Sequence, residues 1–375
     1  MNILELDSFL TSDYPLADYC PSNYEQGRAA FLESAKRNPF FRYTDSLPIT
    51  AKGPNQSDLF IDIAVIGNLT DAKKILIHIS GTHGVEGGAG SGIQNELLSN
   101  SFSLVDDTAI IFIHALNPFG MAWNRRVNEK NIDLNRNFTR DRKTPELYAT
   151  LDPVFNPTEI REFNQSAFDL LVHEHGWPAI KKILAEGQYS FPQGLFYGGE
   201  EIAEGPQLVL DWFKRTFLGR ELTNLYFGIL DVHTGLGPYG VDTLFTPTVP
   251  SEIMLKLFGE KMSLSAQMAT IGYKPTGMFV QGLSKKICKI TKCAEDRIFI
   301  IGQEFGTVAE AQVMLALYEE NNIFHHDEKT YDPNGEAGRK MLNAFYPTER
   351  RWRHLVVQEG RVLVEKSLHI LETMV

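Results

Sequence analysis

The sequence predicts an α/β protein in which helices cover both faces of a sheet. Five short runs rich in Ile, Val and Leu are flanked by turn residues, which is typical of strands. They are Leu59–Ile66, Ile75–Ile79, Ala109–His114, Phe227–Val232 and Ile298–Gly302. The runs lack strict alternation of apolar and polar residues, which indicates strands buried on both faces. With helix-like segments such as Ser91–Leu98 and Val308–Tyr318 between them, they predict one α/β sandwich domain over residues 1–375.

The segments outside these runs are predicted to be mainly helical. Residues 1–45 are polar and have the apolar spacing of a covering helix. The stretch Thr144–Arg220 is interpreted as a helical insert that contains the loop-like Gly187–Gly199. The tail from Asp332 onward is expected to form two helices, the second from about Glu349 to Thr373.

Composition excludes several classes of function. The chain has 375 residues, 43% of them hydrophobic, and a formal net charge of -11. No Lys/Arg run is long enough to bind a polyanion, so a nucleic-acid partner is not expected. Three cysteines, Cys20, Cys288 and Cys293, give no disulfide framework and favour a reducing compartment. No segment approaches the ~20 apolar residues that cross a bilayer, and the acidic N-terminus is unlike a secretory signal, so we expect a cytoplasmic protein.

Polar residues that can bind a metal follow three of the predicted strands. His83 and Glu86 come after the run KKILIHISG, His233 ends FGILDVHTG, and Glu304 lies just past RIFIIG. In open α/β sheets, ligands bind beyond the carboxyl ends of the strands. We therefore expect these four side chains to lie at the same edge of the sheet.

Their chemistry is that of a catalytic zinc site. Such sites commonly combine two imidazoles and one carboxylate and leave a coordination position for water. His83 and Glu86, three residues apart, can reach one ion, and His233 supplies the third ligand. Asp231 is placed to orient a ligand ring. Glu304 is then the general base that takes the proton of the water.

Arginines close to these residues fit a site that hydrolyses a carbonyl compound. They occur in Asn124-Arg125-Arg126 and in the segment Asp133–Phe138, DLNRNF. One guanidinium can stabilise an oxyanion, and another can bind a substrate carboxylate beside an asparagine amide. Taken alone, this segment would be interpreted as a loop braced by Asp133, and an isolated H-x-x-E as a chance occurrence. The occurrence of all these motifs in order favours the metal site.

The ordered motifs resemble the carboxypeptidase A-like zinc metallopeptidase clan, which also contains succinylglutamate desuccinylase and aspartoacylase. The matching motifs are H-x-x-E at His83–Glu86, N-P-x-G at Asn117–Gly120, D-L-N-R-N-F at Asp133–Phe138, D-x-H-T at Asp231–Thr234 and E-x-G-T at Glu304–Thr307. The greatest similarity is to a bacterial subgroup known as a domain of unknown function, whose members also carry a GLFYGG segment and the form DVHTGLGPYG.

The resemblance implies a mixed, mostly parallel eight-stranded sheet between helices and one bound Zn²⁺. It assigns roles to His83, Glu86 and His233 as zinc ligands, Glu304 as the catalytic carboxylate, Arg126 as the oxyanion-stabilising arginine, and Asn135 and Arg136 as the pair that binds the substrate carboxylate. Arg125, beside Arg126, leaves that assignment open by one residue. Carboxypeptidases also use a mobile tyrosine that closes over the substrate; neither Tyr239 nor Tyr273 has a matching context.

These observations predict a zinc-dependent hydrolase of the metallocarboxypeptidase type, which cleaves an amide next to a free carboxylate in a small peptide. The alternative is an N-acyl amino acid deacylase, because such enzymes of the clan act without the closing tyrosine. A non-catalytic metal-binding module is a third reading, disfavoured because all three ligands and the base are present. Nucleotide binding at Gly84–Gly92 is disfavoured because the loop lacks the Lys-Ser/Thr of a P-loop, and no G-x-S-x-G marks a serine hydrolase.

Overall fold

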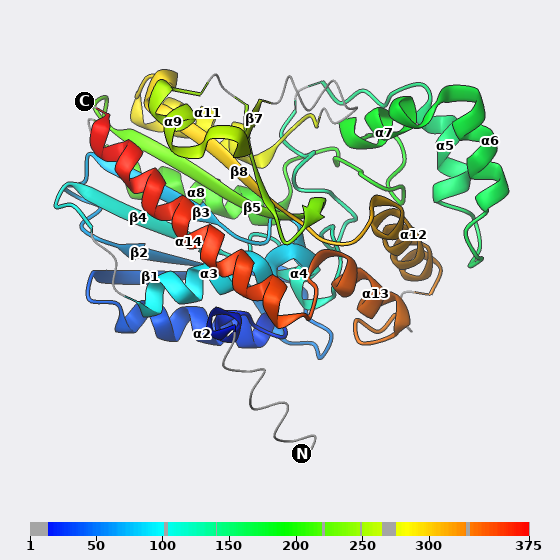
Figure 1. Cartoon of the computed structure of the whole chain (residues 1–375), viewed down its shortest axis with the longest axis horizontal. Coiled ribbons are helices and arrows are strands. Elements are labelled where there is room, and N and C mark those ends of the chain that lie inside the picture. Colours follow the sequence, from blue (N-terminus) through cyan, green and yellow to red (C-terminus); the bar gives the residue numbers. More distant parts are fainter. Residues whose placement is uncertain are drawn as a thin grey trace, which may run out of the picture.

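The computed structural model describes residues 14–100, 104–139, 141–219, 222–247, 250–264, 275–327 and 331–374. Its centre is an eight-stranded sheet in the order β1-β2-β4-β3-β5-β8-β6-β7 (Figure 1). The strands are β1 (Phe41–Lys52), β2 (Asp58–Ile66), β3 (Lys74–Ile79), β4 (Thr108–His114), β5 (Tyr226–Tyr239), β6 (Asp242–Thr246), β7 (Met262–Leu264) and β8 (Ile298–Gly306). The predicted α/β sandwich with a mixed eight-stranded sheet is therefore confirmed.

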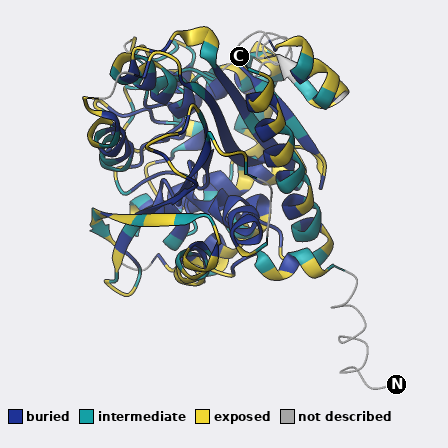
Figure 2. Ribbon diagram, turned by 90° about the vertical axis from the view of Figure 1, so that its left-hand side faces the viewer, coloured by how far each residue is buried: buried dark blue, intermediate teal, exposed yellow. Residues whose placement is uncertain are grey.

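The four central strands β4, β3, β5 and β8 run parallel to one another, and β7 runs parallel to β6. The other three pairings are antiparallel, and β1 and β2 form an edge hairpin. All residues of β4 are buried, whereas β1 is largely exposed (Figure 2). This difference explains why β4 is a continuous apolar run and β1 is not.

Helices form a layer on each face of the sheet. The helices α2 (Tyr24–Arg37), α3 (Gly87–Ser99) and α14 (Arg350–Thr373) enclose a core that contains Phe31, Phe112 and Trp352. The helices α8 (Glu204–Phe217) and α11 (Phe279–Thr291) enclose the core on the opposite face. Each fully buried large apolar side chain contributes roughly 1.5–3 kcal/mol, so both cores stabilise the sandwich.

A third group of helices lies beyond the carboxyl ends of β3, β5 and β8, at the right of Figure 1. It consists of α5 (Tyr148–Phe155), α6 (Gln165–His175), α7 (Trp177–Glu186), α12 (Glu310–His326) and α13 (Glu336–Phe345), which share a separate apolar core. The remaining short elements are η1 (Pro15–Tyr19), η2 (Gly84–Glu86), α4 (Pro118–Ala122), α9 (Glu252–Phe258), η3 (Gly259–Lys261) and η4 (Glu295–Arg297). We refer to the five helices α5, α6, α7, α12 and α13 as the helical lobe.

Some predicted boundaries differ from the structure. The predicted helical N-terminal region ends earlier, because residues from Phe41 onward pair with β2 as strand β1; residues 1–13 lie outside the described part of the chain. The segment Thr144–Arg220 contains α5 to α8, and the tail contains α13 and α14, where helices were predicted. Within the described residues, no helix is long and apolar enough to span a membrane.

Candidate metal centre

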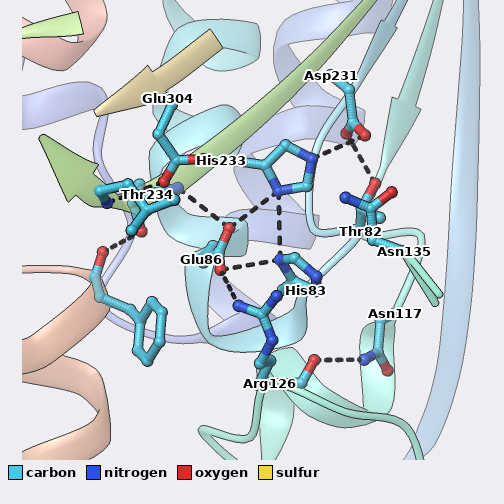
Figure 3. A network of polar contacts seen from close by, with 12 residues as sticks. Thr82, His83, Glu86, Asn117, Arg126, Asn135, Asp231, His233, Thr234 and Glu304 are labelled. Carbon is cyan, nitrogen blue, oxygen red and sulfur yellow. Dashed lines mark hydrogen bonds and ion pairs between the residues drawn. The ribbon is translucent and has the colours of Figure 1, made fainter. Parts of the chain in front are cut away.

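Three side chains from two distant parts of the chain converge at the carboxyl edge of the sheet (Figure 3). His83 follows β3, Glu86 is the last residue of η2, and His233 lies in β5. His83 Nδ1 is 2.9 Å from Glu86 Oε1 and 3.2 Å from His233 Nδ1. His233 Nδ1 is 3.1 Å from Glu86 Oε2. All three residues are buried, and one ligand atom of each lies within 4.8 Å of the other two.

Each of the two imidazoles has its Nε2 atom directed at an aspartate and its Nδ1 atom directed at the centre of the cluster. His83 Nε2 lies 3.1 Å from Asp133 Oδ1, and His233 Nε2 lies 2.9 Å from Asp231 Oδ2. A carboxylate only accepts, so both Nε2 atoms carry hydrogen, which leaves Nδ1 of each ring as the nitrogen that can bind a metal. Thr82 Oγ1 donates to the other oxygen of Asp231 at 2.7 Å and holds that carboxylate in place.

The donor set and its spacing fit a divalent metal ion. Ligands at 2.0–2.1 Å from a tetrahedral zinc ion are separated by about 3.3 Å, and the separations among His83, Glu86 and His233 are close to this value. Two inward lone pairs 3.2 Å apart repel each other unless a proton or a cation lies between them. The predicted ligands are thus brought together in an arrangement that suits a metal.

Electrostatics within the cluster point the same way. Burial opposes charge on Glu86, yet the imidazoles of His83 and His233 hold the pKa of its carboxyl below the ordinary value. Burial likewise opposes protonation of His233, but Asp231 and then Glu86 raise its pKa well above the ordinary value. In the metal-free protein a proton on His233 compensates these carboxylates. A metal ion would take over this compensation and release the proton.

Glu304 lies beside the cluster because β8 pairs with β5. Its backbone is the register partner of His233, so Glu304 lies within β8. The sequence had indicated a position just past the end of this strand. The carboxylate is buried and accepts a hydrogen bond from the Leu236 N–H at 3.1 Å. Burial, and next the charge of Glu86, raise the pKa of Glu304 to about 8.

The two neighbouring arginines have different environments. Arg126 donates from Nη1 to Glu86 Oε1 at 3.2 Å and from Nε to Asp133 Oδ2 at 3.1 Å. Arg125 is fully buried and forms an ion pair with Glu320 on α12. Of these two arginines, Arg126 borders the cavity above the cluster and Arg125 does not, so the geometry favours Arg126 over Arg125 as a ligand-binding residue.

Arg126 is positioned by a close approach between two backbones. A Cβ on Gly84 would lie only 2.2 Å from the Cα of Gly120, so the H-x-x-E and N-P-x-G segments touch through glycines. The Arg126 carbonyl accepts hydrogen bonds from the Gly84 N–H at 3.1 Å and from Asn117 Nδ2 at 3.3 Å. These contacts connect Arg126 directly to the segment that carries His83 and Glu86.

The predicted carboxylate-binding pair is only partly directed at the cavity. Arg136 borders the cavity, donates from Nη1 to the Asn135 carbonyl at 2.9 Å, and its Nε has no hydrogen-bond partner among the described residues. The side chain of Asn135 instead accepts from the Phe279 N–H at 3.2 Å, and Asn135 does not line the cavity. Of the two residues, Arg136 is therefore better placed to contact a ligand in the cavity.

Comparison with known proteins agrees with this architecture. A model of the family described as "Protein of unknown function (DUF2817)" matches residues 20–359. The chain belongs to this family. Among solved structures, bovine thrombin-activatable fibrinolysis inhibitor, in complex with tick carboxypeptidase inhibitor, is similar with a TM-score of 0.51 at 12% identity, covering 95% of this chain and 99% of that one. A carboxypeptidase A from Helicoverpa armigera matches with a TM-score of 0.45 at 13% identity, covering 91% and 81%. A search of functionally curated proteins found no match.

This DUF2817 member therefore has the carboxypeptidase A-like fold that the ordered motifs indicated. A cavity opens above the candidate metal centre. Its floor is polar and includes His83, Glu86, Arg126, Arg136 and Glu304, whereas its walls are mainly apolar.

Two groups of residues around the DUF2817 site were not identified from the sequence. Asp133 was interpreted as a loop brace, but it also orients the ring of His83; its place two residues before Asn135 gave no indication of that partner. The cavity walls come from α7, α12 and the end of α13 at Phe345. Helical spacing shows which residues of a helix share a face, but not which helices meet.

Proposed function

We propose that this protein is a zinc-dependent hydrolase that cleaves an amide bond adjacent to a free carboxylate. The observation that carries the proposal is the convergence of His83, Glu86 and His233, with Glu304 next to them at the floor of a cavity. Two imidazoles and one carboxylate are a common ligand set of catalytic zinc. When bound, zinc supplies the Lewis acidity that polarises the carbonyl and activates water.

Glu304 is the proposed general base. Its carboxylate takes a proton from the attacking water and delivers it to the leaving amine. The Leu236 N–H fixes one carboxylate oxygen and leaves the other available. The pKa of about 8 results from burial and from Glu86, and it falls when the charge of Glu86 is compensated by a cation, because a nearby positive charge favours the ionised form.

The two arginines supply the remaining interactions. Arg126 is already held by Glu86 and Asp133, so its guanidinium is fixed in position before it stabilises a developing oxyanion. Arg136 borders the same cavity. A substrate carboxylate there would accept a charge-assisted hydrogen bond from its guanidinium.

Both a peptide with a free C-terminus and an N-acyl amino acid satisfy these requirements. One observation favours the second. The Tyr239 hydroxyl donates to Glu349, and Tyr239 does not line the cavity. Tyr273 lies outside the described residues. A deacylase does not need a tyrosine that closes over a peptide terminus.

Metal analysis and an activity screen test the proposal together. Protein purified without chelator should contain about one zinc ion per chain and release free amino acids from N-acyl amino acids or short peptides. His83→Ala protein should lose both the zinc and the activity. Bound zinc without hydrolysis of any such amide would instead indicate a non-catalytic metal-binding module, and absence of metal would contradict the proposal.

A further inference from the structure

The cavity above the metal centre extends away from it between two helices. On α7, Trp177, Lys181, Leu184 and Ala185 border the cavity; this is the i, i+4, i+7, i+8 pattern of one helical face. On α12, Glu310, Val313, Met314 and Leu317 do the same with i, i+3, i+4 and i+7. The cavity is thus a groove between one face of α7 and one face of α12.

The inner end of the groove lies at the proposed catalytic residues. A Cβ on Gly187, directly after α7, would lie 2.8 Å from Cδ of Arg136, so the C-terminal end of α7 is next to this arginine. Leu317, Phe196 and Arg126 also border a common space. The other ends of both helices, at Trp177 and Glu310, are therefore the outer end.

A second cavity continues the groove outward. It shares Trp177, Glu310 and Met314 with the first cavity, and adds Phe155, Phe168 and Ala311. From Leu317 to Glu310, α12 rises about 10 Å at 1.5 Å per residue. The combined groove is longer than any single apolar side chain of an amino acid. A ligand that fills it must therefore be an extended apolar chain.

The groove lacks the groups that a peptide backbone would need. Among the described residues, the charged side chains that line it away from the catalytic end are Lys181 and Glu310, and they form an ion pair with each other. A peptide passing between these apolar walls would have unsatisfied N–H and C=O groups, which is unfavourable. A hydrocarbon chain has no such groups and gains free energy from burial.

We propose that the substrate is an N-acyl amino acid with a long aliphatic acyl chain, which lies between α7 and α12 and reaches the Phe155 and Phe168 cavity. This inference rests on the proposed function, because it places the scissile amide at the metal centre and the amino acid carboxylate at Arg136. Hydrolysis adds water across the amide and releases a fatty acid and an amino acid. An extended chain advances about 1.25 Å per carbon, so about eight carbons span the groove along α12.

The test is a series of N-acyl derivatives of one amino acid, with acyl chains from acetyl to dodecanoyl. Each methylene buried in the groove should raise kcat/KM about fourfold, with a plateau once the chain reaches the outer end. Ala311→Trp introduces a large side chain into the second cavity from an exposed position. It should lower the ratio of kcat/KM for dodecanoyl to acetyl substrate at least tenfold. Leu315→Trp places the same side chain on an exposed part of α12 outside both cavities and should leave the ratio unchanged.

Binding provides a separate readout. Isothermal titration calorimetry with Glu304→Gln protein should show tighter binding of longer acyl chains, and Ala311→Trp should remove this gain. Hydrolysis that does not depend on chain length, or that prefers apolar peptides, would overturn the acyl groove and leave the amide hydrolase in place. Absence of all hydrolysis, with chain-length-dependent binding retained, would support the groove and contradict the proposed reaction instead.

Discussion

Each imidazole of the proposed metal centre has an aspartate on its outer nitrogen, Asp133 for His83 and Asp231 for His233. These aspartates determine the tautomer of each ring and make its inner nitrogen a better donor to a metal. Asp133 also accepts from Arg126, so one buried carboxylate orients a proposed ligand and a proposed substrate-binding group. The orientation of both proposed imidazole ligands therefore depends on carboxylates that do not line the cavity.

Replacing the proposed base separates catalysis from metal binding. Glu304→Gln should retain zinc and lower kcat by about 10²- to 10⁴-fold, because the amide is nearly the same size but cannot accept the proton. Zinc content and kcat are measured on the same preparation. Near-normal turnover in the variant would show that Glu304 is not the base.

Replacing the proposed carboxylate-binding residue tests how the substrate is held. Arg136→Ala should lower kcat/KM about 10- to 100-fold for substrates with a free carboxylate, since it removes a charge-assisted interaction. The matching carboxamide substrates should change much less, and Arg136→Lys should be intermediate. Equal losses for acids and amides would place the carboxylate elsewhere. Thermal unfolding of each variant checks that the fold is retained.

At the scale of helices and strands, sequence patterns identified the central strands because burial on both faces produces continuous apolar runs. They did not show where β5 and β8 end. His233 and Glu304 lie in polar segments typical of loops, yet backbone pairing between the two strands continues through both residues. The motifs of the candidate site could be recognised in the sequence because they are short and occur in order. The residues of the groove walls could not be predicted, because they depend on how α7 packs against α12.

Helix α3 is joined to the sheet by buried polar contacts that predict a pH dependence of stability. Ser91 Oγ lies 3.0 Å from His114 Nε2, and Gln94 Nε2 lies 3.1 Å from His78 Nδ1. Burial lowers the pKa of His114 to about 3 and that of His78 to about 4. The unfolded chain therefore takes up protons below pH ~6.5 before the folded protein does.

The free energy of unfolding should consequently fall as pH decreases from about 6.5 towards 4, by about 1.4 kcal/mol per pH unit for each of these histidines. Replacing His114 with phenylalanine, which retains a ring against Phe31, should make this decline shallower by one histidine's share. Urea denaturation of the unaltered protein and of the His114→Phe variant, both without metal, measures the free energy of unfolding across this pH range. Identical slopes would contradict the assignment of His114 as a buried neutral residue.

Considered as a whole, the molecule places its site between two bodies of structure, the carboxyl edge of the sheet and the helical lobe. Side chains from the N-terminal half, from β5 and β8, and from α13 meet in one cavity. The lobe contributes apolar walls, whereas β5, β8 and the segment that follows β3 contribute the proposed ligands and base. Binding at the centre is therefore expected to stabilise the arrangement of segments that are far apart in the sequence.

Metal removal should lower thermal stability. A ligand present at 100 times its dissociation constant stabilises the folded state by about 2.7 kcal/mol, so chelation should lower Tm by several degrees. Restoring zinc should reverse the shift, and His83→Ala protein should show little response to either treatment. Differential scanning calorimetry measures the change. A Tm of the unaltered protein that is insensitive to chelator would be inconsistent with a metal at this site.

The pairing of His233 with Glu304 across β5 and β8 has a consequence for engineering. Adjacent strands are separated by about 4.8 Å through their backbone hydrogen bonds, and this spacing does not depend on surface loops. Substitutions at the outer end of the groove, for example at Trp177 or Ala311, would thus change which substrates bind while the proposed ligand and base keep their relative positions. The sheet makes this protein a scaffold in which selectivity and reactivity can be redesigned separately.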